Sequence, residues 1–355
     1  MSQYWSQVTR ELSPYVPGEQ PQVPNLIKLN TNEHPLLPSA RAMTAIQSLA
    51  ADALRRYPDP EASKLRQAIA TAEGLAPEQV FVGNGSDEVL AHVFQALISA
   101  QSTFTTLNIT YSFYPVWARL YGLELRTIAL REDFSVDVDQ LCQAAGPILI
   151  ANPNAPTGIA LSDADLRRIV ASDPNRLVVV DEAYFGFGAN TASALITEAN
   201  NLLVTRTLSK SHALAGLRVG YALGSNELIE GLVRVKDSFN SYPLDALAQA
   251  GATAAVEDQD WLVRASAEVV ANRDRLTSGL TAMGFEVCPS KANFVFARHP
   301  AHSGKALFDG LRAANILVRR WDKPEIQEYL RITVGTSDQC DALLRHLDAL
   351  TRSLN

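Results

Sequence analysis

Two stretches of sequence determine the fold of this chain: VVVDEAY at residues 178–184 and TRTLSKSHALAGLRVG at residues 205–220. Each contains or follows a brief apolar run of strand length, one ending on Asp181 and the other on Thr207. Runs that are apolar at nearly every position are typical of strands buried on both faces of a sheet. Helical segments separate most such runs in this sequence. This alternation predicts an α/β fold with a mainly parallel sheet flanked by helices.

The alternation continues on both sides of these two motifs. SDEVLAHVFQALIS at 86–99 predicts an amphipathic helix with Ser86 at its cap and acidic residues in its first turn. We expect strands within residues 79–83, 103–107, 123–130, 147–152, 177–183, 201–207 and 219–224.

From about residue 256 the pattern changes. A long helical segment at 261–284 leads into strands expected within 285–289, 292–298, 316–320 and 330–335. The first 38 residues are rich in proline and polar residues and are typical of an extended arm with one short strand. The sequence therefore predicts a large domain over 39–255 and a smaller α+β domain formed by 1–38 and 256–355.

Composition narrows the class of protein. The chain has 355 residues, enough for about two domains, and its 47% hydrophobic and 19% charged residues are typical of a globular protein. A net charge of −7 without a basic run argues against nucleic acid as the main partner. The apolar stretches are too short for a membrane span, and the first residues lack the pattern of a secretory signal. Three separated cysteines and scattered histidines predict neither disulfides nor a metal site, so we expect a cytoplasmic protein.

Lys210 and Asp181 carry the functional prediction. A lone lysine is ordinarily a solvated surface charge, but Lys210 lies among small and hydroxyl residues that suit a tight backbone path. Such an amine can form a Schiff base with a phosphorylated aldehyde. A carboxylate at the end of a buried strand needs a partner, which is a turn amide, an arginine or the protonated nitrogen of a pyridine ring. Together, the two residues indicate pyridoxal phosphate (PLP) chemistry, in which the ring accepts electrons.

A phosphorylated cofactor also needs an anion site. GNGSDE at 83–88 lies between a strand and a helix start, where the backbone amides of Ser86 and Asp87 can bind phosphate. Taken alone, the motif indicates a tight turn capped by Ser86. The basic residues of the second motif favour the phosphate site, because Arg218 offers a guanidinium fork and Thr207 and Ser209 offer hydroxyls.

Two further segments offer contacts to a bound ring. Asn154 in NPNAPTG (152–158) can donate a hydrogen bond to a ring phenolate, although the motif is in any case a proline-pinned turn. Tyr184 can bind the same oxygen. One aromatic residue of TYSFY (110–114) can stack on the ring, and the spacing does not choose among Tyr111, Phe113 and Tyr114.

Three arginines in the predicted small domain, Arg319, Arg320 and Arg331, stand at strand ends. A guanidinium fork there can bind a carboxylate or phosphate of a substrate. Solvation at the surface is the alternative for each of them, and we expect it for Arg320.

These motifs, taken together, resemble those of fold-type-I PLP enzymes, and in particular those of the histidinol-phosphate aminotransferase family of class-II aminotransferases. The resemblance covers most of the chain and keeps the family's order. It rests on LSPY, IKLNTNEHP, RYPDPEASKLR, GNGSDE, TYSFY, NPNAPTG, VVVDEAY, TLSKSHALAGLRVGYALG, NSYPLDALAQAGA and YLRITVGT.

The resemblance implies a role for each matching residue. Lys210 would carry PLP and Asp181 would contact its ring nitrogen, with Tyr184 and Asn154 at the phenolic oxygen. Tyr111 would stack on the ring. Those that the resemblance places at the phosphate are Ser86, Asp87, Ser209, Arg218 and, from the neighbouring subunit, Tyr57. Those that it places toward the substrate are Tyr15, Asn32, Arg319 and Arg331.

We therefore expect a homodimeric aminotransferase with shared active sites and a ping-pong cycle. The expected reaction exchanges L-histidinol phosphate and 2-oxoglutarate for imidazole acetol phosphate and L-glutamate, in histidine biosynthesis. An aromatic amino-acid aminotransferase or a threonine-phosphate decarboxylase on the same scaffold remains open. A PLP-fold ligand-sensing regulator is the non-enzyme alternative. It would ordinarily carry a DNA-binding extension, and we expect none because no basic recognition helix precedes residue 39.

Overall fold

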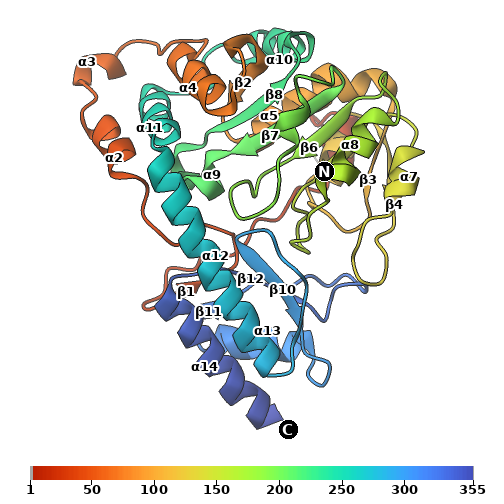
Figure 1. Ribbon diagram of the computed structural model, residues 1–355, viewed down its shortest axis with the longest axis vertical. Helices are drawn as coiled ribbons and strands as arrows, with labels where there is room; N and C mark the ends of the chain where they lie inside the picture. Colours follow the sequence, from red (N-terminus) through yellow and green to blue (C-terminus); the bar gives the residue numbers. More distant parts are fainter. Residues whose placement is uncertain (1–2, 355) are drawn as a thin grey trace.

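A seven-stranded sheet forms the middle of the larger part of the molecule (Figure 1). The computed structural model describes residues 3–354. The strands stand in the order β2-β8-β7-β6-β5-β3-β4; β8 runs antiparallel to both of its neighbours, and the other pairs are parallel. The predicted mainly parallel α/β sheet is confirmed. Its strands are β2 (Val80–Gly83), β3 (Thr103–Leu107), β4 (Glu124–Ile128), β5 (Ile148–Ala151), β6 (Val178–Asp181), β7 (Leu202–Thr207) and β8 (Gly220–Gly224).

The central strands are apolar on both faces because helices cover both faces. In β6, Val178 and Val180 pack into one core cluster, whereas Val179 packs into another. Alternate residues of a strand point to opposite faces, so the two clusters lie on opposite sides of the sheet. The first cluster includes residues of α4, α8 and α11, and the second includes residues of α5, α6 and α10. The helices of the chain are α1 (Gln7–Glu11), α2 (Ala40–Gln47), α3 (Ala51–Leu54), α4 (Ser63–Glu73), α5 (Ser86–Val93), α6 (Tyr114–Leu120), α7 (Val138–Cys142), α8 (Asp163–Ala171), α9 (Leu208–Ser211), α10 (Asn226–Phe239), α11 (Ala246–Glu257), α12 (Gln259–Ala282), α13 (Gly304–Ala313) and α14 (Ser337–Leu354).

A smaller α+β unit follows the long helix α12, which runs from the large sheet down to it (Figure 1). The strands of this unit are β9 (Glu286–Val287), β10 (Phe294–Arg298), β11 (Ile316–Leu317) and β12 (Leu330–Thr333). β10 pairs antiparallel with β9 and β12, whereas β11 pairs in parallel with β1 (Ile27–Lys28) of the N-terminal arm. Leu29 of the arm packs into the same core cluster as residues of α12, α13 and α14. The domain boundaries at 38/39 and 255/256 stay a proposal.

The turn before α5 departs from the sequence prediction. Ser86 does not cap the helix, because Gly85 occupies the cap position with φ +85° and Ser86 is the first helical residue. A β-carbon on Gly85 would lie 2.5 Å from Nη2 of Arg218, and one on Gly220 would lie 2.4 Å from the amide nitrogen of Ser86. Only glycine permits both the positive φ and this close packing of the turn on β8. The α-helical pattern also ends at Val93, and residues Phe94–Ile98 form a π-helical turn.

Candidate active site

A cavity of about 240 Å³ opens where β5, β6 and β7 end at their carboxyl termini. Ligands of parallel α/β sheets gather at this edge, since loops of neighbouring strands diverge there. The N-terminal arm and the smaller unit close the other side of the cavity. Of the residues predicted for the site, those that line it are Tyr15, Asn32, Ser86, Asp87, Tyr111, Asp181, Tyr184, Thr207, Ser209, Lys210, Arg218, Arg319 and Arg331.

Asp181 is the last residue of β6, and its side chain is buried in the cavity wall. The hydroxyl of Tyr114 donates to its Oδ2 at 2.8 Å, and the hydroxyl of Thr205 lies 3.4 Å from Oδ1. Burial raises the pKa of Asp181 to about 6, although the hydrogen bond from Tyr114 acts in the opposite direction. No cationic side chain forms an ion pair with this carboxylate among residues 3–354. The carboxylate is therefore suited to a cationic partner in the cavity.

Lys210 lies in α9, directly after β7, and faces Asp181 from the same cavity. Its Nζ donates to the backbone carbonyl of Thr31 in the N-terminal arm at 2.9 Å. Burial lowers the pKa of Lys210 to about 8, and the nearby guanidinium of Arg331 lowers it further in the same direction. A substantial fraction of the amine is thus unprotonated at mildly alkaline pH, and this is the form that attacks an aldehyde.

The start of α5 and the segment around β7 form an anion-binding corner of the cavity. Gly85 brings the first amides of α5 beside Arg218, whose Nη2 lies 3.7 Å from Oδ2 of Asp87. Arg218 has the left-handed backbone conformation, with φ 51°. The hydroxyl of Thr207 accepts a hydrogen bond from the amide of Ser209 at 3.1 Å. Free amides at a helix start, hydroxyls and a guanidinium are the groups that bind phosphate.

Aromatic side chains line the cavity between this corner and the N-terminal arm. The hydroxyl of Tyr111 donates to Oδ1 of Asp87 at 3.1 Å, and its ring meets that of Tyr114 edge-on. Tyr15 of the arm lies beside Tyr111, with ring centroids 6.2 Å apart. The hydroxyl of Tyr184 accepts a hydrogen bond from Nδ2 of Asn32 at 2.9 Å. Burial raises the pKa of both Tyr111 and Tyr184, so both phenols are neutral.

Two arginines face the cavity from the smaller unit. Nη2 of Arg331 donates to the carbonyl of Asn30 at 2.9 Å, whereas its Nε is buried without a hydrogen-bond partner among the described residues. Burial lowers the pKa of Arg331. The indole of Trp321 lies 5.2 Å from Arg331 and 5.6 Å from Arg319, as in cation–π contacts. A buried guanidinium with a free donor is an anchor for an anionic ligand.

Two predicted site residues do not line the cavity. Nδ2 of Asn154 donates to the carbonyl of Ile109 at 2.9 Å and to the hydroxyl of Thr157 at 3.1 Å. The amide of Asn154 therefore ties the loop 152–158 together, and its predicted contact with the cofactor stays a prediction. Tyr57 is 82% exposed and stacks on Tyr242, with ring centroids 4.7 Å apart.

Sequence reasoning missed several contacts of the site. It left Tyr114 among three aromatic candidates for ring stacking, although this tyrosine is fully buried and bonds Asp181. It missed Trp321 beside the two arginines and the backbone carbonyl of Thr31 at Lys210. A tryptophan two residues after Arg319 could have been found, because the pair shares a short loop. A backbone carbonyl leaves no signal in the sequence.

The family model "Aminotransferase class I and II" matches residues 24–347. The chain belongs to this family. It is 53% identical over 356 residues to histidinol-phosphate aminotransferase of Aromatoleum aromaticum, spanning 99% of this chain and 100% of that relative. It is 55% identical over 347 residues to the enzyme of the same name from Acetobacter pasteurianus, spanning 98% of each.

Solved structures agree on the fold of this aminotransferase. The crystal structure of histidinol-phosphate aminotransferase from Sinorhizobium meliloti in complex with pyridoxal-5'-phosphate matches with a TM-score of 0.88. The match covers 100% of this chain and 99% of that chain at 24% sequence identity. The predicted fold-type-I architecture is thus confirmed, and the chain is a PLP-dependent aminotransferase.

The residues present fit the cofactor. A part-buried lysine with a lowered pKa and a buried aspartate without a cationic partner among residues 3–354 line one cavity. Gly85 lies so close to the guanidinium of Arg218 that a β-carbon on residue 85 would collide with it. Within residues 3–354, no group of three or more His, Cys, Asp or Glu side chains could hold a metal ion. Over the same residues, no helix has the length and apolar character needed to cross a bilayer.

Proposed function

We propose that this aminotransferase converts L-histidinol phosphate and 2-oxoglutarate into imidazole acetol phosphate and L-glutamate, a step of histidine biosynthesis. The observation that carries the proposal is identity of 53% and 55%, over nearly the whole chain, with curated histidinol-phosphate aminotransferases. The pocket supports it, because Arg331 and Arg319 offer guanidinium groups to a phosphate or carboxylate.

In this proposal the roles of the side chains follow from their positions. When bound, PLP supplies an aldehyde that joins amines and a ring that accepts electrons. Lys210 would hold the aldehyde carbon, and its Nζ would move the substrate's α-proton. Asp181 keeps the pyridine nitrogen protonated, and Tyr184 donates to the phenolic oxygen. The amides of Ser86 and Asp87, with Thr207, Ser209 and Arg218, hold the phosphate, and Tyr111 packs against the ring.

The substrate would enter between the arm and the smaller unit. Tyr15 and Asn32 contact it from the arm, and Arg331 binds its anionic group with Arg319 nearby. The same arginines must accept both partners of a ping-pong cycle, because histidinol phosphate carries a phosphate and glutamate carries carboxylates. A planar guanidinium fork binds either anion.

A half-reaction screen tests this function. We expect histidinol phosphate and glutamate each to bleach the visible absorption of the PLP-loaded protein, because both would transfer their amino group to the cofactor. Phenylalanine and tyrosine should react much more slowly. Faster bleaching by phenylalanine or tyrosine than by histidinol phosphate would make the protein an aromatic aminotransferase. Release of carbon dioxide from threonine phosphate would make it a decarboxylase, and no reaction with any donor would leave a ligand sensor.

Arg331→Gln should raise KM for histidinol phosphate and for glutamate by about 10-fold to 100-fold, with a smaller change in kcat. The reason is the loss of a charge-assisted hydrogen bond to both anions, worth about 1.5–3 kcal/mol. Steady-state kinetics with each substrate measure the change. The matched control is Arg320→Gln, since Arg320 pairs with Asp322 and donates to the carbonyl of Gln327, away from the cavity. Equal effects of both substitutions would place the substrate's anionic group elsewhere.

The active site is also proposed to be completed by a second copy of the chain in the cytoplasm. Tyr57 is 82% exposed, and 48% of the Arg218 side chain remains accessible at the cavity. A homodimer would bring Tyr57 of one subunit to the phosphate corner of the other. The free cysteines Cys142, Cys288 and Cys340 agree with a reducing compartment.

Mixing two impaired variants tests whether sites are shared. Tyr57→Phe and Lys210→Ala protein, denatured and refolded together in equal amounts, should exceed the separate variants by up to about a quarter of wild-type activity. Half of the dimers would be mixed, and each mixed dimer would hold one intact site. The control mixture combines Asp181→Asn with Lys210→Ala. These residues line one cavity of one chain, so no mixed dimer regains an intact site. Activity no higher than the sum of the two separate variants would show a self-contained site.

A further inference from the structure

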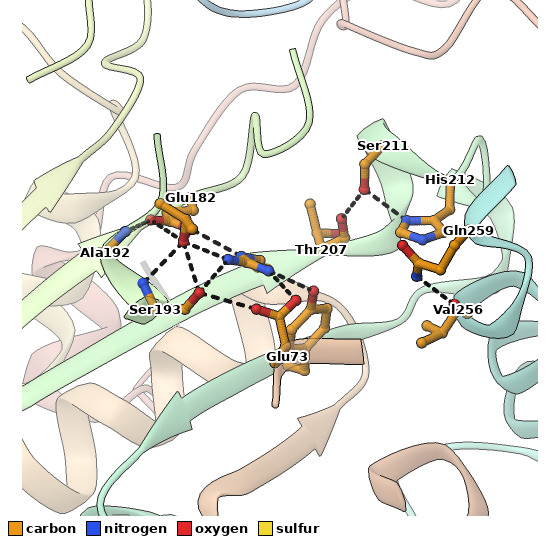
Figure 2. A network of polar contacts seen from close by, with 12 residues as sticks. Glu73, Glu182, Ala192, Ser193, Thr207, Ser211, His212, Val256 and Gln259 are labelled. Carbon is orange, nitrogen blue, oxygen red and sulfur yellow. Dashed lines mark hydrogen bonds and ion pairs between the residues drawn. The ribbon is translucent and has the colours of Figure 1, made fainter. Parts of the chain in front are cut away.

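Behind the active site, a buried arginine joins five polar side chains (Figure 2). Arg206 of β7 is 1% exposed. Its Nε lies 2.9 Å from Oε2 of Glu182, and Nη1 lies 2.5 Å from Oε1 of Glu73. The remaining donors reach the hydroxyls of Thr191 at 2.6 Å, Ser193 at 3.0 Å and Tyr221 at 3.5 Å. All five N–H donors of the guanidinium therefore have an acceptor.

Each oxygen of the two carboxylates in this cluster also accepts at least one hydrogen bond. Oε1 of Glu182 accepts from the amide of Ala192 at 2.6 Å, and both of its oxygens accept from the hydroxyl of Thr191. Oε2 of Glu73 accepts from the hydroxyl of Ser193 at 3.0 Å. Buried ion pairs are retained at low cost only when every donor and acceptor is matched, as here. The Arg206 cluster, meaning these side chains with Arg206 at the centre, is thus a rigid junction.

The junction ties together the strand ends that carry the active site. Glu182 follows Asp181 at the end of β6, and Arg206 precedes Thr207 at the end of β7. Asp181 pairs with Thr205 across the two strands, and the hydroxyl of Thr205 points toward its carboxylate. Successive residues of a strand face opposite sides. Asp181 and Thr207 therefore face the cavity, while Glu182 and Arg206 face away from it, and neither lines it.

We infer that Arg206 and Glu182 are positioning residues, which hold the ends of β6 and β7 so that Asp181 and Lys210 face the cofactor at fixed separation. The inference rests on the roles proposed above for Asp181 and Lys210. Lys210 lies only three residues beyond the end of β7, so a shift of that strand end moves its amine. Glu73, at the end of α4, and the segment 191–193 anchor the junction to the rest of the domain.

The alternative is that the cluster only stabilises the fold, and a control arginine separates the two. Arg176 is also buried, but it binds the carbonyls of Ala144 and Cys142 near the amino-terminal end of β6, the end opposite to Asp181. The test variant is the double substitution Arg206→Gln with Glu182→Gln, which removes both charges of the most deeply buried ion pair and leaves Glu73, whose side chain is 13% exposed, as the remaining charge of the cluster. The control is Arg176→Gln. Both should lower the melting temperature of the PLP-free protein.

The deciding measurement is the dissociation constant of PLP, obtained by titrating PLP-free protein and following the visible absorption band. We expect the double variant to raise this constant about 10-fold to 100-fold, because losing one well-placed charge-assisted contact to the cofactor changes a binding constant by about that factor. The position of the band should also shift, whereas Arg176→Gln should stay within twofold of wild type in dissociation constant and leave the band in place. A double variant with wild-type PLP affinity and band position would overturn the inference.

If the double variant does not fold, a single variant can be tested in its place. Glu182→Gln alone keeps the shape of the side chain, exchanges one carboxylate oxygen for an amide nitrogen and removes one charge, so the same comparison with Arg176→Gln applies to it. Lys210→Ala, measured in the same series, keeps the two proposals apart. If Lys210→Ala retains the visible band, the role of Lys210 fails, whatever the Arg206 variants do. If that band is lost but the Arg206 and Glu182 variants bind PLP as the wild type does, only the positioning role fails.

Discussion

Lys210→Ala should abolish the visible absorption band of the PLP-loaded protein and lower kcat by about 10⁴-fold. In the proposed function, Lys210 supplies both the amine that joins the aldehyde and the base that moves the α-proton, and alanine removes both. The amine has a pKa of about 8 and lines the same cavity as Asp181. No other lysine is among the residues that line this cavity, so none is placed to replace it. Absorption spectra and single-turnover kinetics with glutamate measure the two losses separately. PLP should still bind without a covalent bond, because the phosphate corner remains intact.

Two controls make this result specific. Lys210→Arg keeps a cation at the position but cannot form the bond to the aldehyde under ordinary conditions, so it should lose the band as alanine does. Lys236→Met removes a buried lysine, whose Nζ donates to the carbonyl of Pro60 at 3.2 Å and lies outside the cavity. That variant should keep the band. An unchanged spectrum in Lys210→Ala would end the assignment of Lys210 as the cofactor's lysine.

The sequence predicted the strands and the position of the cavity well, because both follow from local patterns. Short apolar runs such as 178–180 can be buried on both faces only inside a parallel sheet, and the polar residues that follow them must meet at its edge. Asp181 and Lys210 were found in this way, since their residue types and positions at strand ends are visible in the sequence. Both line the same cavity, as expected.

Contacts that depend on packing between distant segments were not visible. Nothing in TYSFY distinguishes Tyr114, which bonds Asp181, from Tyr111, which bonds Asp87. In the sequence, Arg206 looks like an ordinary charged residue at the end of an apolar run. In the structure it is buried between the carboxylate of Glu73 in α4 and that of Glu182, the residue that follows β6. The predicted cap at Ser86 was wrong by one residue, because the cap depends on the positive φ of Gly85 and on Gly220 of a distant strand.

Asp181→Asn should lower kcat by about 10²-fold to 10³-fold, the effect expected when a preorganised charge is removed from an active site. It should also make the PLP-free protein more stable at pH 8. Burial raises the pKa of Asp181 from 3.8 to about 6 in the folded protein, so ionising it opposes folding. Ionised Asp181 thus lowers the free energy of unfolding. This loss is absent below pH 4, grows as the pH rises toward 6, and is then constant at about 3 kcal/mol. Asparagine has the same shape, keeps an acceptor for Tyr114 and carries no charge.

Melting temperatures of the PLP-free proteins at pH 5 and pH 8 measure this effect. The control is the neighbouring carboxylate, Glu182. Glu182 is equally buried but bound to Arg206, so Glu182→Gln should destabilise the PLP-free protein at pH 8, whereas Asp181→Asn should stabilise it. With PLP bound, the wild type should be more stable than Asp181→Asn. The proposed contact with the pyridinium nitrogen stabilises the carboxylate of Asp181 and cannot stabilise a neutral asparagine in the same way. A PLP-free Asp181→Asn protein less stable than wild type at pH 8 would show that the carboxylate is already satisfied without the cofactor.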